Sequence, residues 1–117
     1  MKQINAYNAP YVIDLERWSR MDIFNQIGNI SSEVGRSFNA KRRNDDVDCS
    51  QAVIRAIDLF DATISVLITN KSPKSKEVLR AKEVYLTAIF SDKEQAKENQ
   101  SLERYFMQFA IAARISR

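Results

Sequence analysis

The chain has 117 residues, with 18 lysines and arginines against 15 acidic residues, so it has the size of one domain and a modest formal charge of +3. It contains no histidine and one cysteine, Cys49, which excludes histidine-dependent catalytic triads, Cys/His zinc sites and a disulfide within the chain. Two glycines and two prolines favour long helices over a many-stranded β fold. We therefore expect a single domain over residues 1–117, with 1–13 as a loose N-terminal arm.

The leading segment, residues 11–18, is unusually apolar for the start of a chain. Asp14 is one candidate N-cap for a helix here, and Ser19, with Asp22 three residues later, is another. The apolar side chains, Ile13 among them, either cover one end of a helical bundle or form an arm that binds a partner. The candidate partner contacts are Tyr11, Leu15 and Trp18.

The next helix is expected to run to about Lys41. Its apolar seam has the three- and four-residue spacing of helices that pack side by side. The seam consists of Phe24, Ile27, Ser31, Val34 and Phe38. A stripe of small residues lies beside it, although glycine inside a helix costs about 1 kcal/mol relative to alanine. The stripe therefore predicts close approach of another helix, from this chain or from a second copy. The candidate self-association residues are Gly28, Ser32 and Gly35.

The central helix is expected over residues 50–70, with Asp48 and Gln51 as a capping box and Asn70 as the stop. Its apolar residues recur at the period of one helical face. They are Val53, Ala56, Ile57, Phe60, Ile64, Leu67 and Ile68. Asp58 and Asp61 are two carboxylates three residues apart, which suits a solvated helix face better than acid–base or metal chemistry.

A third helix is expected from Pro73, with Ser72 as its N-cap, to about Phe90. Its broad apolar face is made of Val78, Leu79, Tyr85, Leu86, Ile89 and Phe90. Cations gather in the connections before and after the central helix, which an up-and-down path places at opposite ends of a bundle. The candidate nucleic-acid contacts are Lys41, Arg42, Arg43, Lys71, Lys74, Lys76 and Arg80.

The segment 91–100 is polar and is expected to be a loop or a fully solvated helical turn. A last helix is expected over about 101–115, with one apolar face and alanines that keep it slim. Four amphipathic segments joined by short connections predict an all-α fold, an antiparallel up-and-down four-helix bundle.

The pattern Asp14-Leu15-x-x-Trp18, at the start of a helix in a small basic chain, resembles the proteins encoded in intervening sequences of bacterial 23S ribosomal RNA genes. Those proteins are similar in fold to the accessory variability determinants of diversity-generating retroelements. The resemblance implies a bacterial four-helix bundle that forms ring oligomers, and an accessory role beside a reverse transcriptase or nucleic acid. The chain departs from the arginine-rich second helix of the ribosomal group, because residues 51–60 contain only Arg55. The later pattern Ser101-Leu102-x-x-Tyr105-Phe106, with Ala112-Ala113-Arg114, resembles small uncharacterised bacterial helical proteins.

These observations predict a non-enzymatic adaptor that forms a homo-oligomer and docks a protein partner. The alternative is a nucleic-acid-binding accessory protein, which the sequence pI of 9.1 favours. We expect no cofactor and no small-molecule substrate. One unpaired cysteine and no secretory signal indicate the cytoplasm, and no apolar run has the roughly 20 residues that span a bilayer.

Cys49 lies beside a predicted helix N-terminus, and the dipole of that helix favours a thiolate. An incidental cysteine without a reactive role is nevertheless the simpler interpretation.

Overall fold

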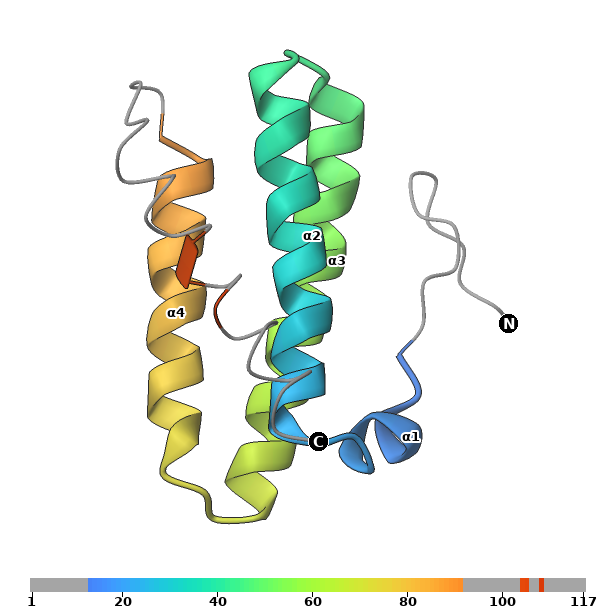
Figure 1. Ribbon diagram of the computed structural model, residues 1–117, viewed down its shortest axis with the longest axis vertical. Helices are drawn as coiled ribbons and strands as arrows, with labels where there is room; N and C mark the ends of the chain where they lie inside the picture. The colour runs from blue at the N-terminus through green and yellow to red at the C-terminus, as the bar shows by residue number, and fades with distance from the viewer. Residues whose placement is uncertain (1–12, 92–103, 106–107, 109–117) are drawn as a thin grey trace, which may run out of the picture.

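The computed structural model describes residues 13–91, 104–105 and 108. The described residues form four helices and confirm the all-α class: α1 (Leu15–Ser19), α2 (Ile23–Arg42), α3 (Asp46–Thr69) and α4 (Lys74–Ile89). The three long helices lie side by side, and the chain reverses its direction between α2 and α3 and again between α3 and α4 (Figure 1). The short α1 lies beside the end of the group where α3 gives way to α4 (Figure 1).

One of the four helices is therefore the short α1. The helix predicted over 101–115 lies outside the described residues, apart from Arg104, Tyr105 and Gln108, which are helical. Its role as the closing member of an up-and-down bundle stays a prediction. The expected N-terminal arm and the loop over 91–100 also lie outside the described residues, except for Ile13 and Ser91.

Aspartates begin the first three helices. Asp14 accepts a hydrogen bond from the Arg17 backbone N–H, and Asp22 accepts one of 2.8 Å from the Asn25 N–H, so Ser19 caps neither helix. Asp45 caps α3 through the Asp48 N–H at 3.0 Å, which makes the predicted capping role of Asp48 wrong. The chain reverses directly before α3, at Asn44 with its left-handed φ of 60°. Asparagine tolerates this conformation, so α3 starts four residues earlier than predicted.

The core is built from one face of each long helix. Tyr85 of α4 lies at its centre, with no exposed surface, and its ring contacts Phe38 of α2 at 5.8 Å and Phe60 of α3 at 5.9 Å between centroids. The Ser37 hydroxyl donates to the Val34 carbonyl, so the phenol of Tyr85 is the donor in its 2.7 Å bond to Ser37 Oγ. This bond satisfies a polar group that would otherwise be costly to bury.

The predicted apolar faces are only partly buried. Ile27, Val34 and Phe38 of the α2 seam are buried, as are most of the predicted α3 residues. Three predicted core residues are exposed instead: Ile68, Leu79 and Phe90 keep 61%, 43% and 67% of their surface. Ile68 and Phe90 stand at the ends of their helices, and Leu79 lies one position away from the buried line through Val78, Ala81 and Tyr85.

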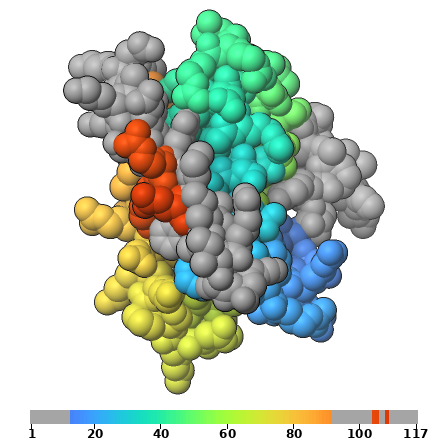
Figure 2. All heavy atoms as spheres, in the orientation of Figure 1, coloured from blue at the N-terminus to red at the C-terminus, as the bar shows by residue number. Residues whose placement is uncertain are grey.

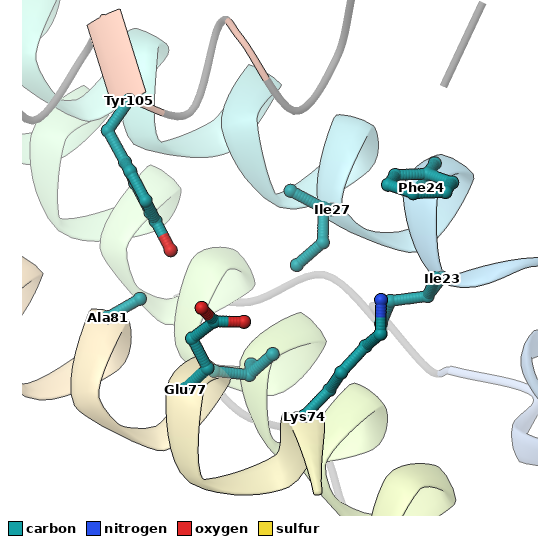
Figure 3. A pocket seen from close by; sticks show the side chains of 8 residues that line it. Ile23, Phe24, Ile27, Lys74, Glu77, Ala81 and Tyr105 are labelled. Carbon is teal, nitrogen blue, oxygen red and sulfur yellow. The ribbon is translucent and has the colours of Figure 1, made fainter. Parts of the chain in front are cut away.

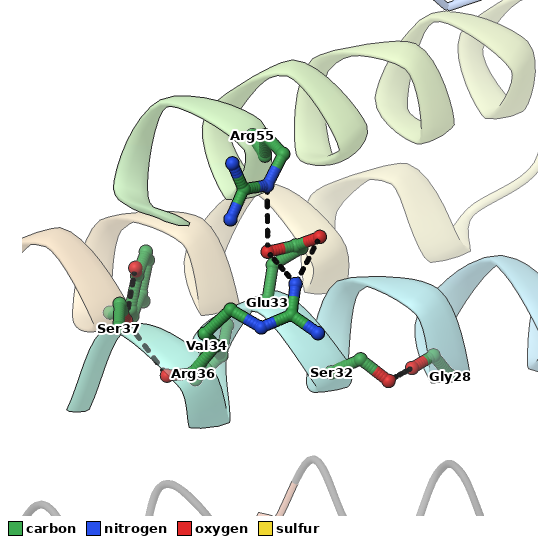
Figure 4. Close-up of polar contacts among 8 residues, drawn as sticks. Gly28, Ser32, Glu33, Val34, Arg36, Ser37 and Arg55 are labelled. Carbon is green, nitrogen blue, oxygen red and sulfur yellow. Dashed lines mark hydrogen bonds and ion pairs between the residues drawn. The ribbon is translucent and has the colours of Figure 1, made fainter. Parts of the chain in front are cut away.

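Ion pairs tie the helices together at their edges. Glu33 of α2 accepts a 3.1 Å hydrogen bond from Arg55 Nε of α3 and a second from Arg36 on its own helix (Figure 4). Asp61 of α3 pairs with Lys82 of α4 at 2.6 Å. Within the described residues, no helix combines the length and the apolar character needed to cross a bilayer.

Candidate functional site

The short helix α1 is fixed to the long helices by buried hydrogen bonds. Trp18 keeps 9% of its surface, and its indole Nε1 donates to Thr63 Oγ1 of α3 at 2.9 Å. The side-chain amide of Gln26 in α2 donates to the backbone carbonyls of Trp18, at 2.8 Å, and Met21, at 3.3 Å. Trp18 is therefore part of the core, and the interpretation that the leading segment covers one end of the bundle holds for Trp18 and for the partly buried Ile13.

Leu15 differs from Trp18 because 53% of its surface is exposed. It borders an open groove of about 440 Å³ between α1 and the C-terminal end of α3. The groove is lined by Leu15, Glu16 and Ser19 from α1 and by Ser65, Val66 and Thr69 from α3. Leu15 and Val66 supply its apolar side chains, and the other lining residues, with Asn70 beyond the end of α3, are polar. Among the described residues that line it, there is one carboxylate and no cation. The last carbonyls of α3 accept hydrogen bonds from the backbone N–H groups of Asn70, Lys71 and Ser72, so the negative charge at this groove comes from Glu16.

A second exposed surface runs along the outer side of α4. Lys76, Leu79, Arg80, Glu83 and Val84 are exposed and lie three or four residues apart, the spacing of one helical face. Leu79 and Val84 keep 43% and 46% of their surface, although they are large apolar side chains. The atoms of α4, yellow to orange, lie at the middle and lower left of the molecule in Figure 2. This surface combines apolar side chains with two cations and one acid.

The cations at the α2–α3 end serve the fold. Lys41 Nζ donates to the backbone carbonyls of Ile89, at 2.7 Å, and Ser91, at 2.8 Å, and so caps the C-terminus of α4. Arg43 pairs with Asp48 at 2.8 Å and with Asp45 at 3.6 Å. Arg42 donates to Asn39 Oδ1 on its own helix. These three predicted nucleic-acid contacts thus already have intramolecular partners.

The remaining candidate cations gather around the α3–α4 connection. Lys71, Lys74, Lys76 and Arg80 are exposed there, and Lys74 Nζ lies 5.6 Å from the ring centroid of Phe24. This end of the bundle is opposite to the α2–α3 turn, as the reversal of the chain requires (Figure 1). The seven candidates therefore form two separate groups, and each cation of the first group has an intramolecular hydrogen-bond or ion-pair partner.

A small cavity lies between α2, α4 and Tyr105. Its apolar walls come from α2 and α4, and Lys74, Glu77 and Tyr105 contribute polar groups (Figure 3). Burial, with a smaller contribution from the Glu77 carboxylate, raises the pKa of the Tyr105 phenol. The volume is about 20 Å³, which holds about one water molecule. The cavity is a packing defect and has no room for a substrate.

The small-residue stripe of α2 is not packed closely by the described residues. A Cβ atom built on Gly35 meets nothing within 4 Å in the described part of the chain. Ser32, which is exposed, turns its hydroxyl back to the Gly28 carbonyl at 3.3 Å (Figure 4). Internal packing of the described helices therefore does not explain the glycine at position 35.

Asp58, Asp61 and Cys49 are the candidate reactive side chains of α3. Asp61 is engaged by Lys82, and burial followed by the charge of Asp61 raises the pKa of Asp58. Burial also raises the pKa of Cys49, and the charge of Lys41 opposes it. The raised pKa gives no support to a thiolate at Cys49, which lies in the first turn of α3. Among the described residues, no three acids or cysteines are grouped as a metal site.

The comparisons with known proteins leave these surfaces as the only guide to function. No protein-family model, no curated protein and no solved structure matches the chain. Of the residues predicted from the sequence, Leu15 is on an open groove and Tyr11 lies outside the described residues. Val66 and Val84 were not among the residues predicted from the sequence. Val84 is exposed, whereas Val66 is partly buried and packs against the core, so no common sequence signal marks the two.

Proposed function

We propose that the protein is a non-enzymatic helical adaptor that self-associates and docks a protein partner. The observation that carries this proposal is the exposed Leu15 on a groove whose wall is fixed by the Trp18–Thr63 hydrogen bond. A preformed apolar surface loses little conformational freedom on binding, which favours association. Val47 and Phe90, with 68% and 67% of their surface exposed, lie near the other end of the bundle and offer a separate contact for a second protein.

Two polar groups of the interior support an adaptor over an enzyme, although the buried Gln26 Oε1 has no hydrogen-bond partner among the described residues. The phenol of Tyr85 and the hydroxyl of Thr63 are each joined to another side chain in the core. The chain has no histidine to act as a general base near neutral pH. The groups with raised pKa, such as Tyr85 and Cys49, owe it first to burial, and none of them lies on the groove.

Co-purification of two differently tagged copies tests the self-association. When both copies are expressed together, we expect the copy captured by its tag to retain the other in comparable amount. A tagged helical protein of similar size and charge serves as the control, and it should retain neither copy. Failure of the two copies to retain each other at micromolar concentration would remove the self-associating part of the proposal.

A second candidate function is binding to nucleic acid. It is favoured by Lys71, Lys76 and Arg80, which are exposed around one end of the bundle and form no ion pair within the described residues. Binding through phosphates should fall steeply between about 50 and 200 mM salt. A titration with RNA and DNA at both salt concentrations, comparing wild type with Lys71, Lys74 and Lys76 changed to Glu, tests this function. Arg36→Glu with Arg42→Glu, in the half of α2 that leads to the opposite end of the bundle, is the control. Binding that is indifferent to salt and to the triple change would exclude this second function.

A further inference from the structure

The groove beside α1 and the outer face of α4 have complementary shapes, one concave and one convex. They also carry charged side chains of opposite sign, Glu16 in the groove and Arg80 on α4. The groove is concave, and its lining includes the apolar side chains of Leu15, which is half exposed, and Val66, which is partly buried, together with the carboxylate of Glu16. The α4 face is convex, as any single helix face is, and presents Leu79 next to Arg80. An exposed leucine flanked by a cation matches an apolar groove flanked by a carboxylate.

The two surfaces cannot meet within one molecule. The groove lies between α1 and the C-terminal end of α3. Leu79 and Arg80 are exposed on the outer side of α4, and the inner side of α4 packs on α3. In Figure 1, α1 and α4 stand on opposite sides of α2. A contact between the two surfaces therefore requires a second copy of the chain.

We propose that the protein self-associates head to tail, with the α4 face of one copy seated in the α1–α3 groove of the next. The proposal rests on the self-association proposed above and names its two surfaces. Leu79 of one copy packs between Leu15 and Val66 of its neighbour. Arg80 reaches Glu16 of that neighbour. Because the two contact surfaces differ, the interface is heterologous.

Glu16 is available for this exchange of partners. It pairs with Arg20 of its own helix at 3.4 Å, and the two side chains keep 81% and 67% of their surface. Exposed pairs of this kind contribute little to stability. Replacement of the local pair by Arg80 of a neighbour, beside buried apolar side chains, lets the carboxylate act in a less hydrated environment, where its attraction to a cation is stronger.

Two substitutions test the interface from its two sides. Leu15→Asp replaces the exposed apolar side chain of the groove with a charge, and Leu79→Asp does the same on the α4 face. Because both leucines are about half exposed, we expect both variants to fold, and far-UV circular dichroism checks this. Each variant alone should sediment at the 13.5 kDa of one chain. Val47→Asp, at an exposed apolar side chain away from both surfaces, should keep the wild-type mass.

The decisive experiment mixes the two variants. In a head-to-tail contact, the intact groove of the Leu79→Asp variant accepts the intact α4 face of the Leu15→Asp variant, so the equimolar mixture should form a dimer that extends no further. Two monomeric variants that stay monomeric in the mixture would overturn the proposal, because an intact groove and an intact α4 face would then not be sufficient for the contact.

Charge reversal gives an independent measurement. Glu16→Lys and Arg80→Glu should each raise the dissociation constant severalfold, and the two changes in one chain should restore it. An oligomeric wild type that is indifferent to Leu15→Asp, Leu79→Asp and both charge reversals would overturn the head-to-tail contact alone. A monomeric wild type would instead remove the self-association on which it rests.

Discussion

Trp18 and Thr63 are 45 positions apart in the sequence, and the indole Nε1 of the first donates a buried 2.9 Å hydrogen bond to the hydroxyl of the second. This bond holds the five-residue α1 against α3. An isolated helix of that length is unstable in water, so the position of α1 and the shape of the groove depend on this tertiary contact.

Thr63→Val keeps the shape of the side chain and removes the acceptor of the indole N–H. We expect a loss of about 1–3 kcal/mol in the free energy of unfolding, because a buried donor is left without a partner. Denaturant unfolding followed by the fluorescence of the single tryptophan measures it. Thr69→Val, at an exposed position of the same helix, is the control and should change the free energy by less than about 0.5 kcal/mol. Equal effects of the two changes would contradict a structural role of the bond.

Phe60→Ala should cost about 3–5 kcal/mol, because the Phe60 side chain has no exposed surface and its truncation leaves a cavity. Phe90→Ala is the matched control, since Phe90 keeps 67% of its surface. The free energies of unfolding of the two variants in urea give the comparison. A similar melting temperature for both variants would mean that the core lies elsewhere.

Tyr85 makes the stability fall at high pH. Burial raises the pKa of its phenol well above the ordinary range, and the hydrogen bond to Ser37 only partly offsets this. In the unfolded chain the same group loses its proton near pH 10, whereas the native state retains it. The unfolded state then binds fewer protons than the native state, so the free energy of unfolding is unaffected below about pH 10 and decreases above it.

Urea unfolding at a series of alkaline pH values measures this decrease. Tyr85→Phe removes the titrating group, so its stability should depend less steeply on pH than that of the wild type, although it starts from a lower value at neutral pH. An equally steep alkaline loss in both proteins would exclude Tyr85 as its source.

Gly35→Ala tests the space beside the small-residue stripe. Gly35 has no positive φ, and a Cβ there meets nothing within 4 Å among the described residues. Alanine should therefore stabilise the protein by about 0.5–1 kcal/mol through its helix propensity. Thermal unfolding measures the change. Destabilisation would show that another segment or another copy packs against this position.

The sequence predicts the parts of the fold that depend on local pattern. The three- and four-residue spacing identified the long helices, and it placed Phe38, Phe60 and Tyr85 correctly in the core. Periodicity cannot tell which edge of a broad apolar face is covered, because that depends on the neighbouring helix. Leu79 and Ile68 were assigned to the core for this reason, and both are exposed.

The candidate site depends on contacts that no local pattern shows. The groove exists because Trp18 reaches Thr63, and the cations at the α2–α3 end are occupied because Lys41 reaches the end of α4. From the sequence, partner binding by Trp18 and phosphate binding by Lys41 both stay open as alternatives to a structural role. Leu15 was identified as a contact residue, but its counterpart Val66 was not, since only the docking of α1 brings the two to the same groove.

The mass of the wild-type protein in solution tests the central claim most directly. Sedimentation equilibrium over a range of micromolar concentrations should give a mass that rises with concentration to a multiple of the 13.5 kDa of one chain. A mass of 13.5 kDa at every concentration would contradict the account, and it would leave the groove beside Leu15 without the occupant proposed for it.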